Sequence, residues 1–181
     1  MGPARVFAAT SGRVLTVLTA VGSLAVLVGT TASGGVHELL RFGAMPVLAL
    51  VVVWALFWHP QVEVSDGEIV LRNVLRTVRI PWPTFRGADT RWALTVETSD
   101  GSFTAWAAPA GARRGRGDPS APTAGGVALE IAARHGSLEA AGYLHPGPPP
   151  AGVRVTATWH WPAIAAATAL AALAAIGAVT R

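Results

Sequence analysis

The sequence of 181 residues contains no cysteine, no lysine and few charged side chains of either sign. Without cysteine, the chain cannot be a disulfide-built secreted domain or a metal protein that uses thiolate ligands. Charged residues make up 13% of the chain, which is about half the share usual in soluble globular domains. Together with 51% apolar residues, this excludes a disordered chain and argues against an ordinary soluble enzyme.

The excess of positive charge lies beside apolar segments rather than on the polar part of the chain. Arginines outnumber acidic residues by 14 to 10, which gives a formal net charge of +4. Residues 60–154 hold ten arginines and nine acids, a net charge of only +1. The other arginines, Arg5, Arg13, Arg41 and Arg181, flank apolar runs. Because no basic stripe with interleaved aromatic residues is present, we expect no nucleic-acid partner.

Three apolar runs are candidates for membrane-spanning helices: residues 14–36, 42–58 and 159–180. A helix rises about 1.5 Å per residue, so about 20 apolar residues cover the roughly 30 Å hydrocarbon core of a bilayer. Tryptophans near the ends of the second and third runs are typical of membrane borders. An alternative for the first run is a secretory signal that is cleaved.

The arginines also predict the orientation. Arg5 and Arg13 precede the first run, which favours a cytoplasmic N-terminus formed by residues 1–13. Two crossings then return the chain, so the polar domain is expected in the cytoplasm. In the third run, alanines repeat every four residues, and such small side chains allow close packing with the other helices or a homo-oligomer.

After the second run the apolar pattern changes from helical to alternating. Residues 60–108 show short alternating stretches separated by the Asp66-Gly67 and Asp100-Gly101 turns. This pattern is typical of an antiparallel β meander with one buried face. The sequence therefore predicts a small β domain in this segment.

The remaining polar residues predict a linker, short helices and a second linker. Residues 109–126 are rich in glycine, proline and arginine without periodicity, which is typical of a linker. Residues 127–145 have helical spacing and are expected to form one or two short helices that cover the apolar face of the sheet. Residues 146–158 are expected to lead back to the membrane as a linker.

Residues 62–107 resemble the bacterial pleckstrin-homology-like (PH-like) domain that is found in actinobacterial membrane proteins. The similar motifs are SDGEIVLRNVLRTVRIPW, with its turn and strand pair, and the later hairpin TSDGSFTAWAAP. The layout, with two apolar runs before the domain and one after it, is also similar. The resemblance implies a partly open barrel or bent sheet closed by a C-terminal helix, in a bacterial cell membrane, and it implies no activity.

A search for catalytic and metal-binding patterns finds none. The five histidines never fall at a metal-ligand spacing, and no Walker loop, no Gly-Xaa-Ser-Xaa-Gly elbow and no paired carboxylates in an apolar setting occur. We therefore expect no catalytic residue, no cofactor and no metal.

Three arginines around one predicted turn are the candidate contacts for lipid or a partner. Arg72 and Arg79 are expected to point away from the apolar face of their strands, with Arg76 at the tip. Their guanidinium groups could bind lipid phosphates, and the alternative is a solvated hairpin balanced by neighbouring acids. Trp82 is a further candidate contact or a core anchor.

These observations predict a membrane α-helical hairpin joined to a small antiparallel PH-like β domain, followed by a third transmembrane helix. The expected function is that of a non-enzymatic interaction or scaffold module at the cytoplasmic face of the membrane. The alternative is a module that senses lipid headgroups through its arginine hairpin. The expected partners are membrane lipids and a protein.

Overall fold

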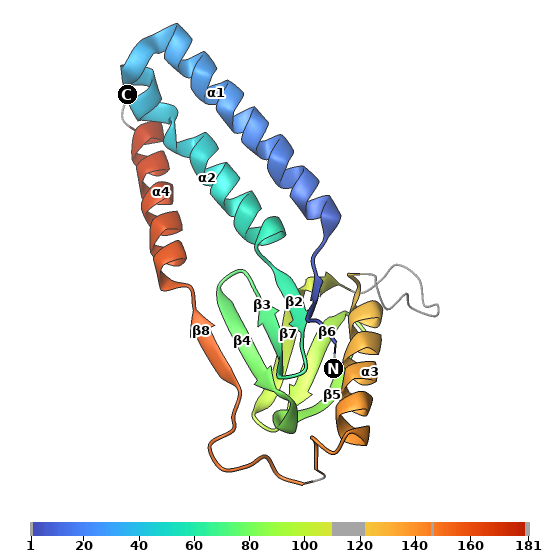
Figure 1. The fold of residues 1–181 in the computed structure, drawn as a ribbon. Coiled ribbons are helices and arrows are strands. Elements are labelled where there is room, and N and C mark those ends of the chain that lie inside the picture. Colours follow the sequence, from blue (N-terminus) through green and yellow to red (C-terminus); the bar gives the residue numbers. More distant parts are fainter. Residues whose placement is uncertain (1, 110–121, 146, 180–181) are drawn as a thin grey trace. The chain divides into compact units, whose positions relative to one another are not determined.

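The computed structural model describes residues 2–109, 122–145 and 147–179. The chain divides into two units that alternate along the sequence (Figure 1). The first, here called the β unit, consists of Met1–Ala9 and Pro60–Trp159. The second, the helical unit, consists of Thr10–His59 and His160–Arg181.

The helical unit contains helices α1 (Thr10–Phe42), α2 (Ala44–Val53) and α4 (Trp161–Val179), with the π-helical turn η1 (Trp54–Trp58) at the end of α2. Helix α2 packs against both α1 and α4. Helix α1 is kinked at Gly35, whose φ of 65° is a conformation that glycine adopts readily. This kink lies one residue before the expected end of the first run at residue 36, and a second helical segment continues from it to Phe42.

Two helices of the described part are long and apolar enough to cross a membrane: Gly12–Phe42, with 31 residues, and Trp161–Val179, with 19. The helix Ala44–Trp58, which corresponds to the expected second span 42–58, is apolar but shorter. In each long helix only 11% of the residues of the most apolar window are buried. Their apolar side chains therefore lie mostly on the surface of the unit.

The β unit contains two antiparallel sheets (Figure 1). The five-stranded sheet has the order β1-β2-β3-β4-β8, with β1 (Arg5–Phe7), β2 (Gln61–Val64), β3 (Glu68–Arg72), β4 (Arg76–Pro81) and β8 (Thr156–Trp159). The three-stranded sheet consists of β5 (Phe85–Asp89), β6 (Ala93–Thr98) and β7 (Gly101–Pro109). Among the described residues, the strands are thus hydrogen-bonded as two sheets and not as one continuous barrel.

Helix α3 (Ala124–Ala140) completes the core of the β unit. Its Val127, Ile131 and Leu138 are buried together with the alternating apolar residues of both sheets. The Thr123 hydroxyl accepts a hydrogen bond from the amide of Gly126 at 3.2 Å and caps the helix. The expected short helices in 127–145 form one helix, because nothing between residues 124 and 140 interrupts the backbone hydrogen bonding.

Two strands lie outside the β domain that the sequence predicted. Strand β1 lies in the expected N-terminal tail 1–13, and β8 begins in the expected linker 146–158. All four residues of β8 are exposed, so the strand shows no apolar alternation, and β1 has only three residues. Of the expected linker 109–126, residues 110–121 lie outside the described residues.

The chain passes between the two units at one end of the five-stranded sheet. The register pairs Phe7 with Val62, Gln61 with Arg72, and Arg76 with Trp159. Phe7 is followed by α1 after two residues, Gln61 follows η1 after two residues, and Trp159 precedes α4 by one residue. We call this end of the sheet, which also carries the β3–β4 turn, the connecting end.

Candidate interaction surface

The turn between β3 and β4 is fastened to the second sheet by one asparagine. The Asn73 side chain donates to the carbonyl of Thr104 at 2.8 Å and accepts from the amide of Trp106 at 2.8 Å. The Asn73 amide also bonds to the carbonyl of Arg76 at 2.9 Å and closes the turn. The predicted arginine hairpin is therefore present and is held next to strand β7.

Two of the three predicted arginines are engaged with glutamates of the same sheet. Arg72 forms an ion pair with Glu63 at 3.4 Å, and Arg79 pairs with Glu68 at 2.5 Å. Arg72 and Arg79 point away from the buried face, as predicted from the alternation. Since each has an acidic partner, neither presents an uncompensated positive charge to a ligand.

Arg76 has a different environment from the other two arginines. Its guanidinium carbon lies 5.7 Å from the ring centroid of Trp159 and 6.0 Å from that of Phe103. Such cation–π contacts contribute about 0.5–1 kcal/mol each at exposed sites. Within the described residues no acidic side chain forms an ion pair with Arg76, so its charge is held by aromatic rings and is not neutralised.

Exposed apolar side chains lie on the β3–β4 turn and on strands β7 and β8, which contact this turn or pair with β4. Leu75 is 50% exposed at the tip of the turn, Trp106 is 56% exposed on β7, and Trp159 is 44% exposed on β8. Trp106 points outward because its neighbours Ala105 and Ala107 are buried. We call Leu75, Arg76, Trp106 and Trp159 the connecting-end surface.

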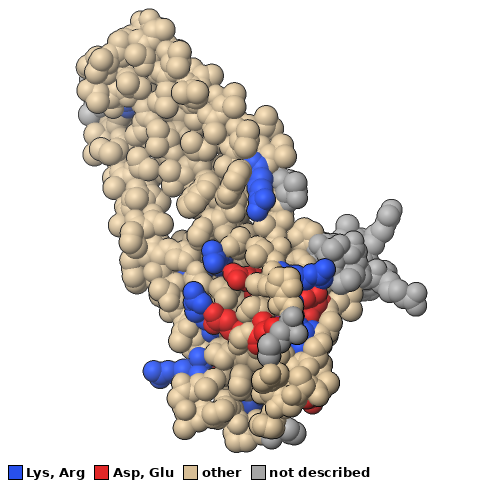
Figure 2. Space-filling model, viewed as in Figure 1, with Lys and Arg blue, Asp and Glu red and all other residues tan. Residues whose placement is uncertain are grey.

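From the sequence alone, Trp159 is expected at a membrane border, and no role is expected for Trp106 or Leu75. The sequence does contain large apolar residues at outward-facing positions of strands. These positions can be recognised only when the register of the strands is known. On the face shown in Figure 2, the charged side chains gather on the β unit, whereas the helical unit shows few.

Trp82 lies in the core of the β unit. It is 2% exposed, and its indole nitrogen donates to the carbonyl of Ser65 at 2.9 Å. Its ring packs edge-to-face on Phe85, with the centroids 5.9 Å apart. This burial favours its role as a core anchor, and Trp82 also lines a small pocket.

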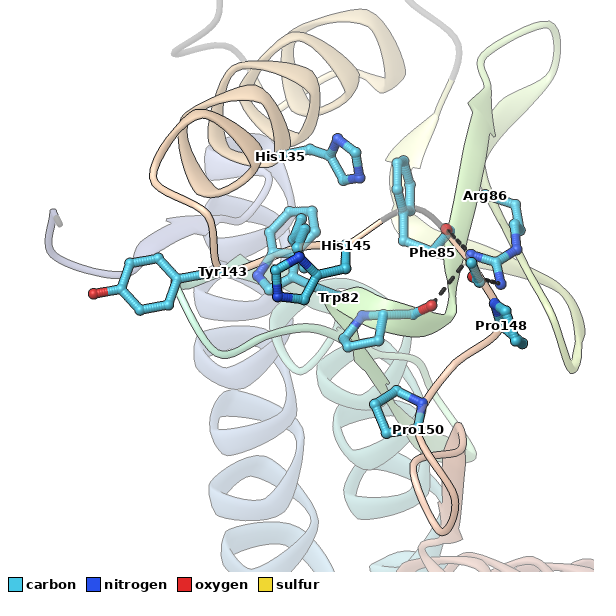
Figure 3. A pocket seen from close by; sticks show the side chains of 11 residues that line it. Trp82, Phe85, Arg86, His135, Tyr143, His145, Pro148 and Pro150 are labelled. Carbon is cyan, nitrogen blue, oxygen red and sulfur yellow. Dashed lines mark hydrogen bonds between the residues drawn. The ribbon is translucent and has the colours of Figure 1, made fainter.

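That pocket lies between Trp82, Phe85 and helix α3 on one side and the proline-rich segment 143–150 on the other (Figure 3). It has a volume of about 210 Å³. The guanidinium of Arg86 at its rim donates to the carbonyls of Pro83 and Phe85 at 3.1 and 3.0 Å. Both bonds come from Nη1, and Nη2 donates to the carbonyl of Gly147 at 3.4 Å, so the guanidinium bridges the two sides of the pocket at its rim.

An ionic network ties helix α3 to the end of the five-stranded sheet where β1 begins and the β2–β3 turn lies. Arg134 forms an ion pair with Asp66 in the β2–β3 turn, and its other terminal nitrogen lies 3.3 Å from Glu130. Arg5 on β1 pairs with the same Glu130 at 2.6 Å. The hydrogen bond from Arg134 lowers the pKa of Asp66 and raises the pKa of Arg134 itself. This network stabilises the fold rather than forming a reactive site.

No group of three or more potential metal ligands occurs within the described ranges.

Comparison with known families identifies one segment of the chain. Residues 59–120, about a third of the sequence, match the family model described as bacterial PH domain. No curated protein and no solved structure matches the chain. The match therefore supports a bacterial PH-like domain in residues 59–120.

Proposed function

We propose that the protein is a non-enzymatic, membrane-anchored scaffold that presents its PH-like β unit on the cytoplasmic side. The observation that carries this proposal is the exposure of the long apolar helices. A core helix of a soluble protein is mostly buried, whereas only 11% of the apolar window is buried in α1 and in α4. A lipid environment is the solvent that satisfies such a surface.

The lengths of the helices fit three crossings. At 1.5 Å per residue, the part of α1 before Gly35 spans about 37 Å, and α4 spans about 28 Å. The helix Ala44–Trp58 spans only about 22 Å. A short span is accommodated by local thinning of the bilayer or by flanking residues, at a modest cost.

The β unit is joined to the helices on the side of Arg13, and Arg5 precedes the first helix as well. Positive residues beside the first span favour a cytoplasmic position for that side.

The absence of cysteine makes the topology directly testable. Two single-cysteine variants are needed: Thr90→Cys, in the exposed loop before β6, and His37→Cys, after the α1 kink. Intact cells that express each variant are treated with a membrane-impermeant maleimide. We expect labelling at position 37, and labelling at position 90 only after permeabilisation. Labelling at position 90 in intact cells would reverse the orientation, and release of the chain by carbonate would exclude membrane insertion.

As an interaction module, the β unit has the connecting-end surface as its best candidate contact. A photo-crosslinking residue at position 106, in the full chain in its membrane, tests this directly. We expect an adduct with a second protein, whereas the same residue at the exposed position 91, in the β5–β6 loop, gives none. If neither a protein nor a lipid adduct forms at position 106, the surface has no contact function.

A second candidate function is the sensing of lipid headgroups through the arginine hairpin. The observation in its favour is Arg76, which has aromatic neighbours and exposed Leu75 beside it. Tryptophan and arginine together are typical of membrane interfaces. A lipid adduct at position 106 that is lost in Arg76→Gln and kept in the ion-paired Arg72→Gln would support this function over the scaffold.

A further inference from the structure

A groove runs along the helical unit between α1 and α2. It has a volume of about 490 Å³. It is lined by Thr16, Val17 and Ala20 of α1, by Leu50 and Val51 of α2, and by Trp54 and Trp58 of η1. This volume falls within the range of small-molecule sites, whereas the pocket of Figure 3 is smaller. The lining is apolar, because the Thr16 hydroxyl donates to the carbonyl of Gly12 at 2.9 Å within its own helix.

The groove results from how the two helices touch. They approach closely at Gly12, where a β-carbon would collide with the carbonyl of Phe57. They touch again where the Ser23 hydroxyl donates to the carbonyl of Pro46 at 2.9 Å. Between these two points, the small side chain of Ala20 leaves space that the facing helix does not fill.

One positive charge marks the end of the groove. Arg13 precedes Thr16, Val17 and Ala20 by three, four and seven residues, so all four side chains share one helix face. The Arg13 guanidinium carbon lies 5.7 Å from the ring centroid of Trp58, which lines the groove. In the part of the chain that the structure describes, no carboxylate forms an ion pair with Arg13.

An apolar groove that ends at an arginine and two tryptophans is chemically complementary to a phospholipid. Guanidinium groups bind phosphate through charge-assisted hydrogen bonds. Tryptophan rings prefer the headgroup level of a bilayer, which is where the phosphate lies. If the phosphate lies at Arg13, the apolar part of the groove runs away from the headgroup, as an acyl chain does.

We propose that this groove binds one anionic phospholipid, with an acyl chain between α1 and α2 and the phosphate on Arg13. The inference rests on the proposed membrane insertion, since only inserted helices meet acyl chains. It concerns a different part of the chain from the arginine hairpin, so either can fail without the other.

Native mass spectrometry of the full-length protein in mild detergent tests the site. The probe is an equimolar mixture of dioleoyl phosphatidylglycerol and dioleoyl phosphatidylcholine, which differ in net charge and share their acyl chains. We expect one bound lipid with about a fivefold preference for the anionic one, the effect of one arginine near a headgroup. Arg13→Gln should remove the preference while lipid still binds, and Ala20→Phe, which fills the groove, should reduce binding of both.

Two matched variants serve as controls. Arg41 also stacks on an aromatic ring, with its guanidinium carbon 5.0 Å from the centroid of Phe42, and it does not line the groove. Val21 is 61% exposed next to Ala20, also outside the groove. Arg41→Gln and Val21→Phe should therefore keep the wild-type binding and preference.

Three results would overturn the proposal: an unchanged preference in Arg13→Gln, unchanged binding in Ala20→Phe, or a second copy of the chain bound in place of lipid. A parallel carbonate extraction separates this failure from that of the proposed function. If the wild-type chain stays in the membrane and binds no lipid, only the groove site is wrong. If carbonate releases the chain, membrane insertion itself is wrong.

Discussion

Arg134 on helix α3 forms an ion pair with Asp66, 68 residues earlier in the chain, in the turn between β2 and β3. The same guanidinium donates to the carbonyls of Gly2 and Pro3, each at 3.1 Å. A single side chain, which is 10% exposed, therefore joins the N-terminal segment, the first β turn and the covering helix. These three elements lie far apart in sequence, so the contact positions helix α3 against the N-terminal segment and the β2–β3 turn.

We expect Arg134→Gln to lower the free energy of unfolding of the β unit by about 2 kcal/mol. Glutamine cannot reach the turn and the N-terminal carbonyls together, and it leaves the buried Glu130 with less compensation. Urea unfolding of the full chain in detergent, followed by tryptophan fluorescence, measures the change. Arg91→Gln removes an ion pair whose arginine is 81% exposed and should cost less than about 0.5 kcal/mol. Equal effects of the two variants would show that the Arg134 contacts add no stability.

The same contact predicts how stability depends on pH. The hydrogen bond from Arg134 lowers the folded-state pKa of Asp66 below its ordinary value of 3.8, and the amide of Arg91 does so for Asp89. A lowered carboxyl pKa means that the unfolded chain binds a proton first as pH falls. The stabilisation is therefore complete above about pH 5 and is lost progressively below about pH 4.

Carbon-13 NMR titration of the aspartate carboxyl groups checks this dependence. The midpoint for Asp66 should lie below 3.8 in the wild type and rise towards that value in Arg134→Gln, while the midpoint for Asp89 stays unchanged. A midpoint for Asp66 that does not respond to Arg134→Gln would contradict the assigned cause.

The elements that the sequence predicts are those in which burial alternates. In β2 and β4, Val62, Val64, Val78 and Ile80 are buried, and the residues between them are not, so the periodic pattern is strong. Asp66-Gly67 lies between β2 and β3 as expected, and Asp100 lies in the expected second turn, directly before β7 begins at Gly101. The outward direction of Arg79 follows from the same pattern and is confirmed by its exposure.

The rest depends on contacts that local pattern does not encode. Strand β8 has no buried residue, so only its pairing with β4 makes it a strand. The neutralisation of Arg72 and Arg79 by glutamates requires the strand register, which composition does not give. For the same reason, Trp159 beside Arg76 could not be separated from a membrane-border tryptophan on sequence alone.

The pairing of β8 with β4 can be tested by disulfide formation, because the native chain has no cysteine. Thr77 lies directly opposite Thr158 in the register. Opposite residues have Cα atoms about 4.5–5.5 Å apart, which a disulfide spans, whereas diagonal neighbours are about 7–8 Å apart. We expect Thr77→Cys/Thr158→Cys to oxidise readily, as seen by a mobility shift that reductant reverses. Equal oxidation of the diagonal pair Thr77→Cys/Thr156→Cys would contradict this register.

Close packing of α4 on the end of α1 predicts that Gly177 tolerates no side chain. Gly177 and Ala174 are the buried residues of α4, and a β-carbon at Gly177 would collide with the carbonyl of Arg41. The Arg41 side chain in turn donates to the Gly177 carbonyl at 3.4 Å. Because that obstacle is backbone, relief requires movement of a whole helix, and we expect Gly177→Ala to destabilise the helical unit by about 1–3 kcal/mol.

Thermal unfolding of the full chain in detergent, followed by helical circular dichroism, measures this effect against Gly22→Ala. Nothing lies within 4 Å of a β-carbon at Gly22, so the better helix propensity of alanine should leave stability unchanged or raise it by up to about 1 kcal/mol. If Gly177→Ala lowers the stability and Gly22→Ala raises it, the contact with Arg41, and not the loss of a glycine, determines the change. If Gly177→Ala is as stable as Gly22→Ala, α4 does not pack against α1 at this point.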